Sequence, residues 1–248
     1  MNPARDFLWA DWPAPPHIRA GTTLRSGGFS LAPYDQLNLG THTGDRMATV
    51  RRNRDALRSA LALPGEPVWL NQIHGTGVVM ADAPASETAD ASVAQQPATV
   101  CAVLTADCLP VVFCNLAGSC WAVAHAGWRG LAAGVLEATV GRLPARSDQL
   151  MVWLGPAIGP AHFEVGAEVR DAFQAFDPAA EAMFVAGHRP GHYFADIYAL
   201  ARARLQRVGI DRIYGGGQCT VDDSDRFYSY RRGSPTGRMA TLVWSTTG

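Results

Sequence analysis

One cysteine and two histidines stand where the sequence pattern places the ends of strands. Cys108 lies in "TADCLPVVF", between two apolar runs, and Asp107 precedes it. His125 follows seventeen residues later in "AVAHAGWRG", and His74 ends the run "VWLNQIH". Thiolate and imidazole are ligands of zinc and copper, and a cysteine beside a histidine can also be a nucleophile. Cys108 is therefore open to three interpretations: a buried core thiol, a nucleophile or a metal ligand.

The strands that carry Cys108 and His125 are predicted to form a hairpin. The runs "LPVVFCN" and "SCWAVAH" are joined by "LAG", which is short enough for a hairpin turn. A turn centred near residue 117 pairs residues whose numbers add up to roughly 233–235. Cys108 and His125 add up to 233. We therefore expect them to face each other at the open end of the hairpin, with Cβ atoms about 5 Å apart.

Positive charge is expected at the same end of this hairpin. "AGWRG" leads into a predicted helix at 129–143, whose free N–H groups and positive dipole end would point toward the site. Arg129 adds a fixed charge there, and together these groups suit an anion such as phosphate. His74, before Gly75, is placed as a ligand would be, but sequence spacing does not bring it to the hairpin.

Apolar spacing predicts one layered α/β domain over residues 1–248. Helices are predicted at 47–61, 129–143, 164–176 and 194–208. Strands are predicted at 67–73, 99–105, 109–115, 119–125, 149–154 and 210–214. Several of these strands are apolar on both faces, which indicates sheets covered on both sides. The polar stretches 81–97 and 186–192 are predicted to be a loop and a turn.

Composition argues against several classes of partner. The net charge is −1, which gives no electrostatic reason to expect nucleic acid or an anionic membrane as partner. The chain has no apolar run long enough to span a bilayer, and its N-terminal stretch interrupts any secretory signal with Asp and Pro. We expect a cytoplasmic protein with reduced cysteines, of which Cys101, Cys114 and Cys120 are core thiols.

Seven blocks, in order along nearly the whole chain, resemble the YfiH-type laccase-domain family. They are "LRSGGFS", "PYDQLNLG", "NQIHG", "ADCLPVVF", "AHAGWRG", "LGPAIG" and "FYSYRR" with "TGR". Members of this family have been called multicopper polyphenol oxidases, purine nucleoside phosphorylases and peptidoglycan editing factors. The resemblance implies an α/β fold of two mixed sheets sandwiched between helices, an α-β-β-α arrangement. The last block has Gly233 where the family has an aspartate.

The resemblance also implies a zinc ion held by His74, Cys108 and His125, with copper as the alternative metal. Three protein ligands leave a fourth position open, as in catalytic zinc sites, and zinc would lower the pKa of a coordinated water toward about 7. The expected enzyme phosphorolyses adenosine, inosine, guanosine and methylthioadenosine to the base and ribose 1-phosphate, and it deaminates adenosine. Its partners would be purine nucleosides and phosphate.

Further residues are candidates for binding and proton transfer. Arg129 with the helix N-terminus is predicted to hold phosphate, and Arg25, Arg46 and Asn38 are additional candidates from other family blocks. Asp107 is a candidate to assist the purine as it leaves.

Three alternatives stay open. Cys108 and His125 could act as a nucleophile pair, or the metal site as a hydrolase, on an amide of a peptidoglycan precursor. A copper polyphenol oxidase is disfavoured, because a laccase needs His-X-His pairs and the seven histidines form none. A closed structural zinc site in a binding module would need a fourth ligand, such as Cys101 or Cys219.

Overall fold

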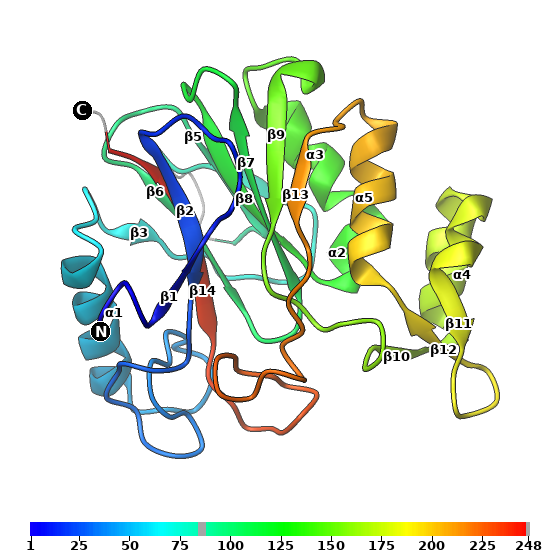
Figure 1. Ribbon diagram of the computed structural model, residues 1–248, viewed down its shortest axis with the longest axis horizontal. Coiled ribbons are helices and arrows are strands. Elements are labelled where there is room, and N and C mark those ends of the chain that lie inside the picture. Colours follow the sequence, from blue (N-terminus) through cyan, green and yellow to red (C-terminus); the bar gives the residue numbers. More distant parts are fainter. Residues whose placement is uncertain (84–87, 247–248) are drawn as a thin grey trace.

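Two mixed sheets lie face to face between helices in the computed structural model, which describes residues 1–83 and 88–246 (Figure 1). In spatial order the first sheet contains β1 (Phe7–Trp9), β2 (Ile18–Thr23), β14 (Met239–Ser245), β6 (Val100–Thr105) and β3 (Pro67–Val68). The second contains β13 (Ile213–Gly215), β9 (Leu150–Leu154), β7 (Leu109–Asn115), β8 (Trp121–Ala126), β5 (Ala91–Ala94) and β4 (Val78–Met80). Each sheet includes parallel and antiparallel pairs.

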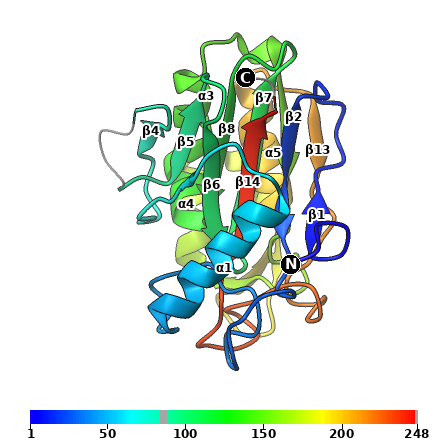
Figure 2. The same ribbon diagram turned by 90° about the vertical axis from the view of Figure 1, so that its left-hand side faces the viewer.

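Helices cover the outer face of each sheet. The helix α1 (Met47–Ala60) packs on the first sheet, and α2 (Trp128–Ala133), α3 (Val135–Arg142) and α5 (Ile197–Arg207) pack on the second. In Figure 2, turned by 90°, α1 lies in front of the strands of the first sheet. The predicted α-β-β-α arrangement of two mixed sheets is therefore confirmed.

A third, smaller sheet extends the molecule beyond this sandwich. It is antiparallel and contains β10 (Glu164–Gly166), β12 (His192–Ala195) and β11 (Phe184–Ala186), beside α4 (Ala167–Phe176). Two 3₁₀ turns, Ser147–Gln149 and Pro178–Met183, complete the helical elements of the described residues. The sequence did not predict this sheet, because strands of three or four half-buried residues leave no clear periodicity.

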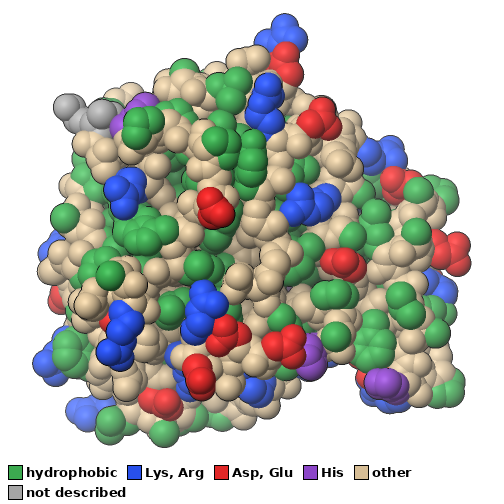
Figure 3. Space-filling model, viewed as in Figure 1, with side chains coloured by type: hydrophobic (Ala, Val, Ile, Leu, Met, Phe, Trp, Pro, Cys, Tyr) green, Lys and Arg blue, Asp and Glu red, His purple; other side chains and the backbone are tan. Residues whose placement is uncertain are grey.

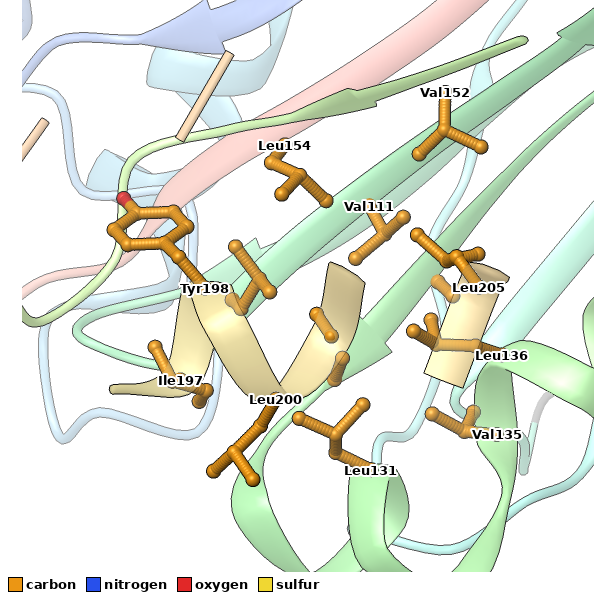
Figure 4. Packing of buried hydrophobic residues seen from close by; sticks show 14 of the residues in the cluster. Val111, Leu131, Val135, Leu136, Val152, Leu154, Ile197, Tyr198, Leu200 and Leu205 are labelled. Carbon is orange, nitrogen blue, oxygen red and sulfur yellow. The ribbon is translucent and has the colours of Figure 1, made fainter. Parts of the chain in front are cut away.

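Alternating side chains of the strands fill the spaces between the layers. Along β6, Val100, Ala102 and Leu104 face α1, whereas Cys101 and Val103 face the second sheet. The strands β7 and β9 and the helices α2, α3 and α5 bury the largest cluster between them, as Figure 4 shows. Both faces of the central strands are thus covered, which explains why they are apolar throughout.

The predicted helices are present with changed boundaries. The helix predicted at 129–143 is divided at Gly134, whose φ of 101° lies in the left-handed region and ends α2. The predictions for 164–176 and 194–208 were wrong at their first residues, which lie in the strands β10 and β12 or in the turn before α5. Helical periodicity did not reveal where these short strands end.

The strands at 99–105, 109–115, 119–125 and 149–154 are confirmed as β6 to β9. The strand predicted at 67–73 shortens to β3, and the one at 210–214 shifts to β13. The sequence missed β2 and β14, which pair in the middle of the first sheet. The polar residues of β2 are accommodated there, since the buried hydroxyls of Thr22 and Thr241 hydrogen-bond at 2.7 Å.

The stretch 81–97 is not a simple loop, because its residues 91–94 form the fully buried strand β5. Residues 84–87 of that stretch lie outside the described residues. The turn predicted at 186–192 is confirmed between β11 and β12, with a hydrogen bond from the His192 N–H to the Arg189 carbonyl. The turn at 186–192 was therefore predicted correctly, whereas the small residues of 81–97 concealed the buried strand β5.

The face seen in Figure 3 carries acidic and basic side chains side by side rather than in regions of one sign. This mixture agrees with the net charge of −1. Among the described residues, no helix has the length and apolar character required to cross a membrane.

Candidate functional site

A cavity of about 710 Å³ brings together residues from distant parts of the chain. His74, Cys108 and His125, together called the cavity triad, form part of its wall. Its lining also includes four arginines and four aromatic side chains: Arg54, Arg129, Arg231, Arg238, Trp69, Trp128, Phe163 and Tyr230. The single acidic residue among the described lining residues is Asp107. The cavity is therefore cationic and has flat apolar surfaces.

The three side chains of the cavity triad converge. The Sγ atom of Cys108 lies 3.9 Å from Nε2 of His74, and the two imidazole rings meet edge to face at 4.7 Å between centroids. One ligand atom of each residue lies within 4.8 Å of the others. Two imidazole nitrogens and a thiol sulfur suit zinc or copper, so the donor set fits the metal that the family resemblance implies.

The hairpin brings Cys108 and His125 together with a register inside the predicted range, but not by direct pairing. His125 pairs with Pro110, so paired numbers add up to 235, and Cys108 lies just before β7. The direct pairing of Cys108 with His125 was therefore wrong by two residues. An even shift preserves the face of the sheet, which explains why the side chains still meet as diagonal neighbours.

The chain also passes very close to the triad where α2 begins. A Cβ atom at Gly127 would lie 2.8 Å from Cδ2 of His74 and 3.1 Å from Sγ of Cys108. Only glycine can enter the helix here without pushing these side chains apart.

Asp90 links both histidines, and the sequence gave no signal for it. Its carboxylate is fully buried and accepts a hydrogen bond from Nδ1 of His125 at 2.8 Å. It also accepts backbone N–H bonds from Ile73, His74 and Gly75, at 3.2, 2.9 and 2.6 Å. His74 has a φ of 61°, a left-handed conformation that these bonds hold in place. Asp90 thus orients one triad side chain directly and the other through its backbone.

Charges in the triad act on one another strongly. Burial would raise the pKa of the Cys108 thiol, but the positive charge of His125 and hydrogen bonds from both histidines lower it to about 6. Burial would lower the pKa of His125, but the Cys108 thiolate and Asp90 raise it to about 9. Both shifts therefore favour a thiolate beside an imidazolium in the metal-free pair. Burial acts to raise the pKa of Asp90, yet its hydrogen bonds lower it overall.

Comparison with known proteins places the chain in a family. The model of the family described as multi-copper polyphenol oxidoreductase laccase matches residues 19–246. The chain belongs to this laccase family. Among its relatives, a purine nucleoside phosphorylase of Pseudomonas aeruginosa is 55% identical, with 96% of this chain and 98% of the relative covered. The purine nucleoside phosphorylase YfiH of Escherichia coli is 53% identical, with 94% and 96% covered. The YfiH-type resemblance is thus confirmed.

Solved structures share the laccase-family fold. A Neisseria meningitidis protein aligns with a TM-score of 0.94 at 48% identity, covering 98% of this chain and all of the other. YlmD of Geobacillus stearothermophilus aligns with a TM-score of 0.91 at 28% identity, covering 100% of this chain and 98% of YlmD. The layered arrangement is therefore shared with these two proteins.

The other predicted site residues of this laccase-family chain lie in different surroundings. Arg129 lines the cavity and its guanidinium stacks on Trp128. Arg25 bonds to the Ser224 carbonyl and to Asp35, outside the cavity lining.

Two more candidates stand away from the cavity wall. Arg46 is exposed at the start of α1, and Asn38 is fully buried. The amide oxygen of Asn38 accepts the N–H of Arg238 at 2.9 Å, and its NH₂ group donates to Asp45 at 3.0 Å. Asn38 therefore holds the backbone that carries Arg238.

Asp107 lies on the cavity wall beside Cys108, with both carboxylate oxygens hydrogen-bonded. One accepts from the Thr220 hydroxyl at 2.6 Å and the other from the Arg231 N–H at 2.7 Å. Its φ of 91° is left-handed, which turns the chain sharply before the cysteine. Asp107 thus ties two C-terminal loop residues to the triad.

Sequence reasoning missed His42, Arg54 and Arg238, here called the cationic end of the cavity. Arg54 follows the run "RRN" on α1, and Arg238 closes the block "TGR", so only the family block offered a signal. Both guanidinium groups donate to backbone carbonyls, Arg54 to Leu39 and Arg238 to residues 236 and 237. Neither has a carboxylate among the described hydrogen-bond partners.

Proposed function

We propose that the chain is a zinc-dependent purine nucleoside phosphorylase that also deaminates adenosine. Its substrates would be adenosine, inosine, guanosine and methylthioadenosine, with phosphate as the second substrate and ribose 1-phosphate as a product. One observation carries this proposal: a single cavity is lined by a triad that could hold a metal, by aromatic side chains, and by Arg54 and Arg238, whose guanidinium groups donate to backbone carbonyls. The names of the Pseudomonas and Escherichia relatives support the same substrate class.

The cavity triad would hold the metal. Bound zinc acts as a Lewis acid that stabilises negative charge on an oxygen or nitrogen of the reacting group. The two histidines and Cys108 would leave a fourth position toward the cavity, and Asp90 would keep His125 in the tautomer whose Nε2 faces the metal.

The cationic end would receive phosphate. Burial and then the positive charges of Arg238 and Arg54 lower the pKa of His42, so the three groups repel one another without an anion. Burial lowers the pKa of Arg54 to about 10 and also lowers that of Arg238. A bound phosphate would relieve this repulsion and accept charge-assisted hydrogen bonds from both guanidinium groups. The negative charge of Cys108 acts to raise the pKa of Arg238 against the effect of burial, so this member of the cationic end also interacts with the cavity triad.

The aromatic walls would hold the nucleoside. Tyr230, which is 60% exposed, and the face of Trp128 that Arg129 leaves uncovered offer flat surfaces on which a purine can stack. Base stacking contributes about 1–3 kcal/mol in other proteins. A phosphate oxygen would then attack the ribose C1′ as the bond from C1′ to the purine nitrogen breaks, and that electron pair leaves with the base. Asp107, hydrogen-bonded by Thr220 and Arg231, would position the nucleoside by accepting a hydrogen bond.

The direct test supplies zinc-loaded protein with inosine and phosphate. We expect hypoxanthine and ribose 1-phosphate in equal amounts, and adenosine without phosphate should yield inosine and ammonia. Variant Cys120→Ala is the matched control for Cys108→Ala, because Cys120 is a buried thiol at the opposite end of the same hairpin. Absence of hypoxanthine from zinc- and copper-loaded protein would overturn the phosphorylase proposal.

A second candidate function rests on the low pKa of Cys108. Cys108, His125 and Asp90 follow one another as nucleophile, base and orienting carboxylate do in cysteine hydrolases, and the lowered pKa of Cys108 favours its thiolate. Such a site could hydrolyse an amide of a peptidoglycan precursor. Rapid alkylation of Cys108 in metal-free protein that retains full activity would favour this hydrolase, whereas activity that depends on bound metal favours the phosphorylase.

A further inference from the structure

A second group of metal-ligating side chains lies outside the cavity lining. His162, Cys219 and Asp222, called the loop triad, place one ligand atom each within 4.8 Å of one another. Nε2 of His162 lies 2.5 Å from a carboxylate oxygen of Asp222. All three come from loops, His162 from the turn after β9 and the other two from the segment after β13.

A backbone bridge fixes these two loops against each other. Ala157 and Cys219 form a parallel bridge, in which the Thr220 N–H donates to the Ala157 carbonyl at 3.0 Å. The Tyr198 hydroxyl lies 2.7 Å from the Ala157 N–H and 2.6 Å from the Gln218 carbonyl. Tyr198 is buried, so it clamps both loops from inside the molecule. The ligands are therefore held on a defined backbone rather than on independent loops.

The donor set of the loop triad suits a divalent metal. Nitrogen, sulfur and carboxylate oxygen are all ligands of zinc, and thiolate with carboxylate would supply two negative charges. The Gly159 N–H donates to Sγ of Cys219 at 3.2 Å, as second-shell donors do toward metal thiolates. Ligand atoms around tetrahedral zinc lie about 3.3–3.8 Å apart, so Asp222 must move slightly away from His162. Its side chain is 62% exposed and has room to move.

We infer that the loop triad is a second zinc site, separate from the cavity triad, that braces the loop at residues 219–222. The loop triad lies beside the bridge between Ala157 and Cys219, and residues next to it contact Asp107 of the cavity wall. Thr220 donates its hydroxyl to the buried Asp107, and Arg231 bonds to both the His162 carbonyl and Asp107. A metal on the loop triad would therefore hold the partners of Asp107 in place, whatever reaction the cavity performs.

The test counts zinc on the purified full-length protein after removal of excess metal. We expect two equivalents on the wild type, one on Cys219→Ala and one on Cys108→Ala, and none on the double variant. His162→Ala should also lose one equivalent of zinc. Its control is His188→Ala, which should lose none, since His188 is a loop histidine outside both triads. Cobalt substitution gives a second readout, because each thiolate contributes its own charge-transfer absorbance.

Several outcomes would overturn the second site. One is a wild type that binds a single equivalent, which Cys108→Ala removes and Cys219→Ala leaves unchanged. Another is rapid alkylation of Cys219 that added zinc does not slow, which would identify a free thiol. If Cys219→Ala loses its circular dichroism signal, Asp222→Asn replaces it, since an exposed amide preserves the loop and weakens only the metal. Unchanged cobalt and zinc counts in Asp222→Asn and His162→Ala together would contradict the inference.

Discussion

The cavity triad and the loop triad use similar donors in different surroundings. In the cavity triad, Cys108 directly precedes β7, His125 lies in β8 and His74 lies in the connection between β3 and β4. The cavity triad faces a cavity of about 710 Å³ and has a fully buried carboxylate behind it. In the loop triad the carboxylate is itself a prospective ligand, and it is mostly exposed. The difference teaches that donor atoms alone do not define a catalytic site. An open coordination position beside a substrate-sized cavity suits chemistry, whereas a group outside that cavity suits bracing of loops.

The largest expected effect comes from Cys108→Ala. Loss of one triad ligand should remove the cavity metal and lower phosphorolysis by about 1,000-fold or more, equivalent to about 4 kcal/mol of transition-state stabilisation. The measurement is hypoxanthine release from inosine together with the zinc count. Near-normal turnover in Cys108→Ala would contradict the assignment of catalysis to the cavity triad and of bracing to the loop triad.

Asp90→Asn should have the next largest effect. An amide cannot balance the charge on His125 or accept all the hydrogen bonds of the carboxylate, so zinc affinity at the cavity triad should fall by about 10–100-fold. Competition with a chelator measures this change. Asp82→Asn is the matched control, because Asp82 also accepts two backbone N–H bonds but lies away from both triads. Equal losses in both variants would assign a structural role to Asp90.

Arg54→Ala should raise the KM for phosphate by about tenfold or more, because one charge-assisted hydrogen bond contributes about 1.5–3 kcal/mol. The KM for inosine should change much less. Arg58→Ala is the control one turn along α1, where the side chain is exposed and pairs with Glu66. A phosphate KM that responds equally to both variants would show that the cationic end does not receive phosphate.

The smallest effect concerns pH in metal-free protein. Because His125 lowers the pKa of Cys108 to about 6, its alkylation rate should rise as pH increases through about 6 and then level off. His125→Gln should move this rise toward the ordinary thiol value. Cys101, buried with a pKa raised to about 12, should stay unreactive across the same range. A Cys108 profile unchanged by His125→Gln would show that the two residues are not coupled.

His125 and Asp90 also make the free energy of unfolding depend on pH, in opposite directions. His125 has a raised pKa in the folded protein, so its stabilising effect is complete below its ordinary pKa of 6.5 and is lost as pH rises through about 9. Asp90 has the opposite effect, because its pKa is lowered in the folded protein. Its stabilising contribution is complete above the ordinary pKa of 3.8 and is lost as the pH falls below that value.

Much of the layered fold could be predicted from local patterns. The apolar runs of β6 to β9 predicted buried strands, since both faces of each are covered. The shorter β5 was hidden in a stretch of small residues, and β2 carries threonines whose hydroxyls hydrogen-bond to the neighbouring strand β14. Local sequence does not reveal such partners on a strand more than 200 residues away, which explains why β2 was missed.

The sequence by itself identified His74, Cys108 and His125 as candidate metal ligands and predicted that Cys108 and His125 share one face of a hairpin, because side-chain direction repeats every two residues. Only the tertiary structure brought His74 to them, placed Asp90 behind both histidines and gathered the cationic end. These contacts join segments far apart in the chain. Sequence spacing carries no distance across such separations, and packing of the two sheets decides them.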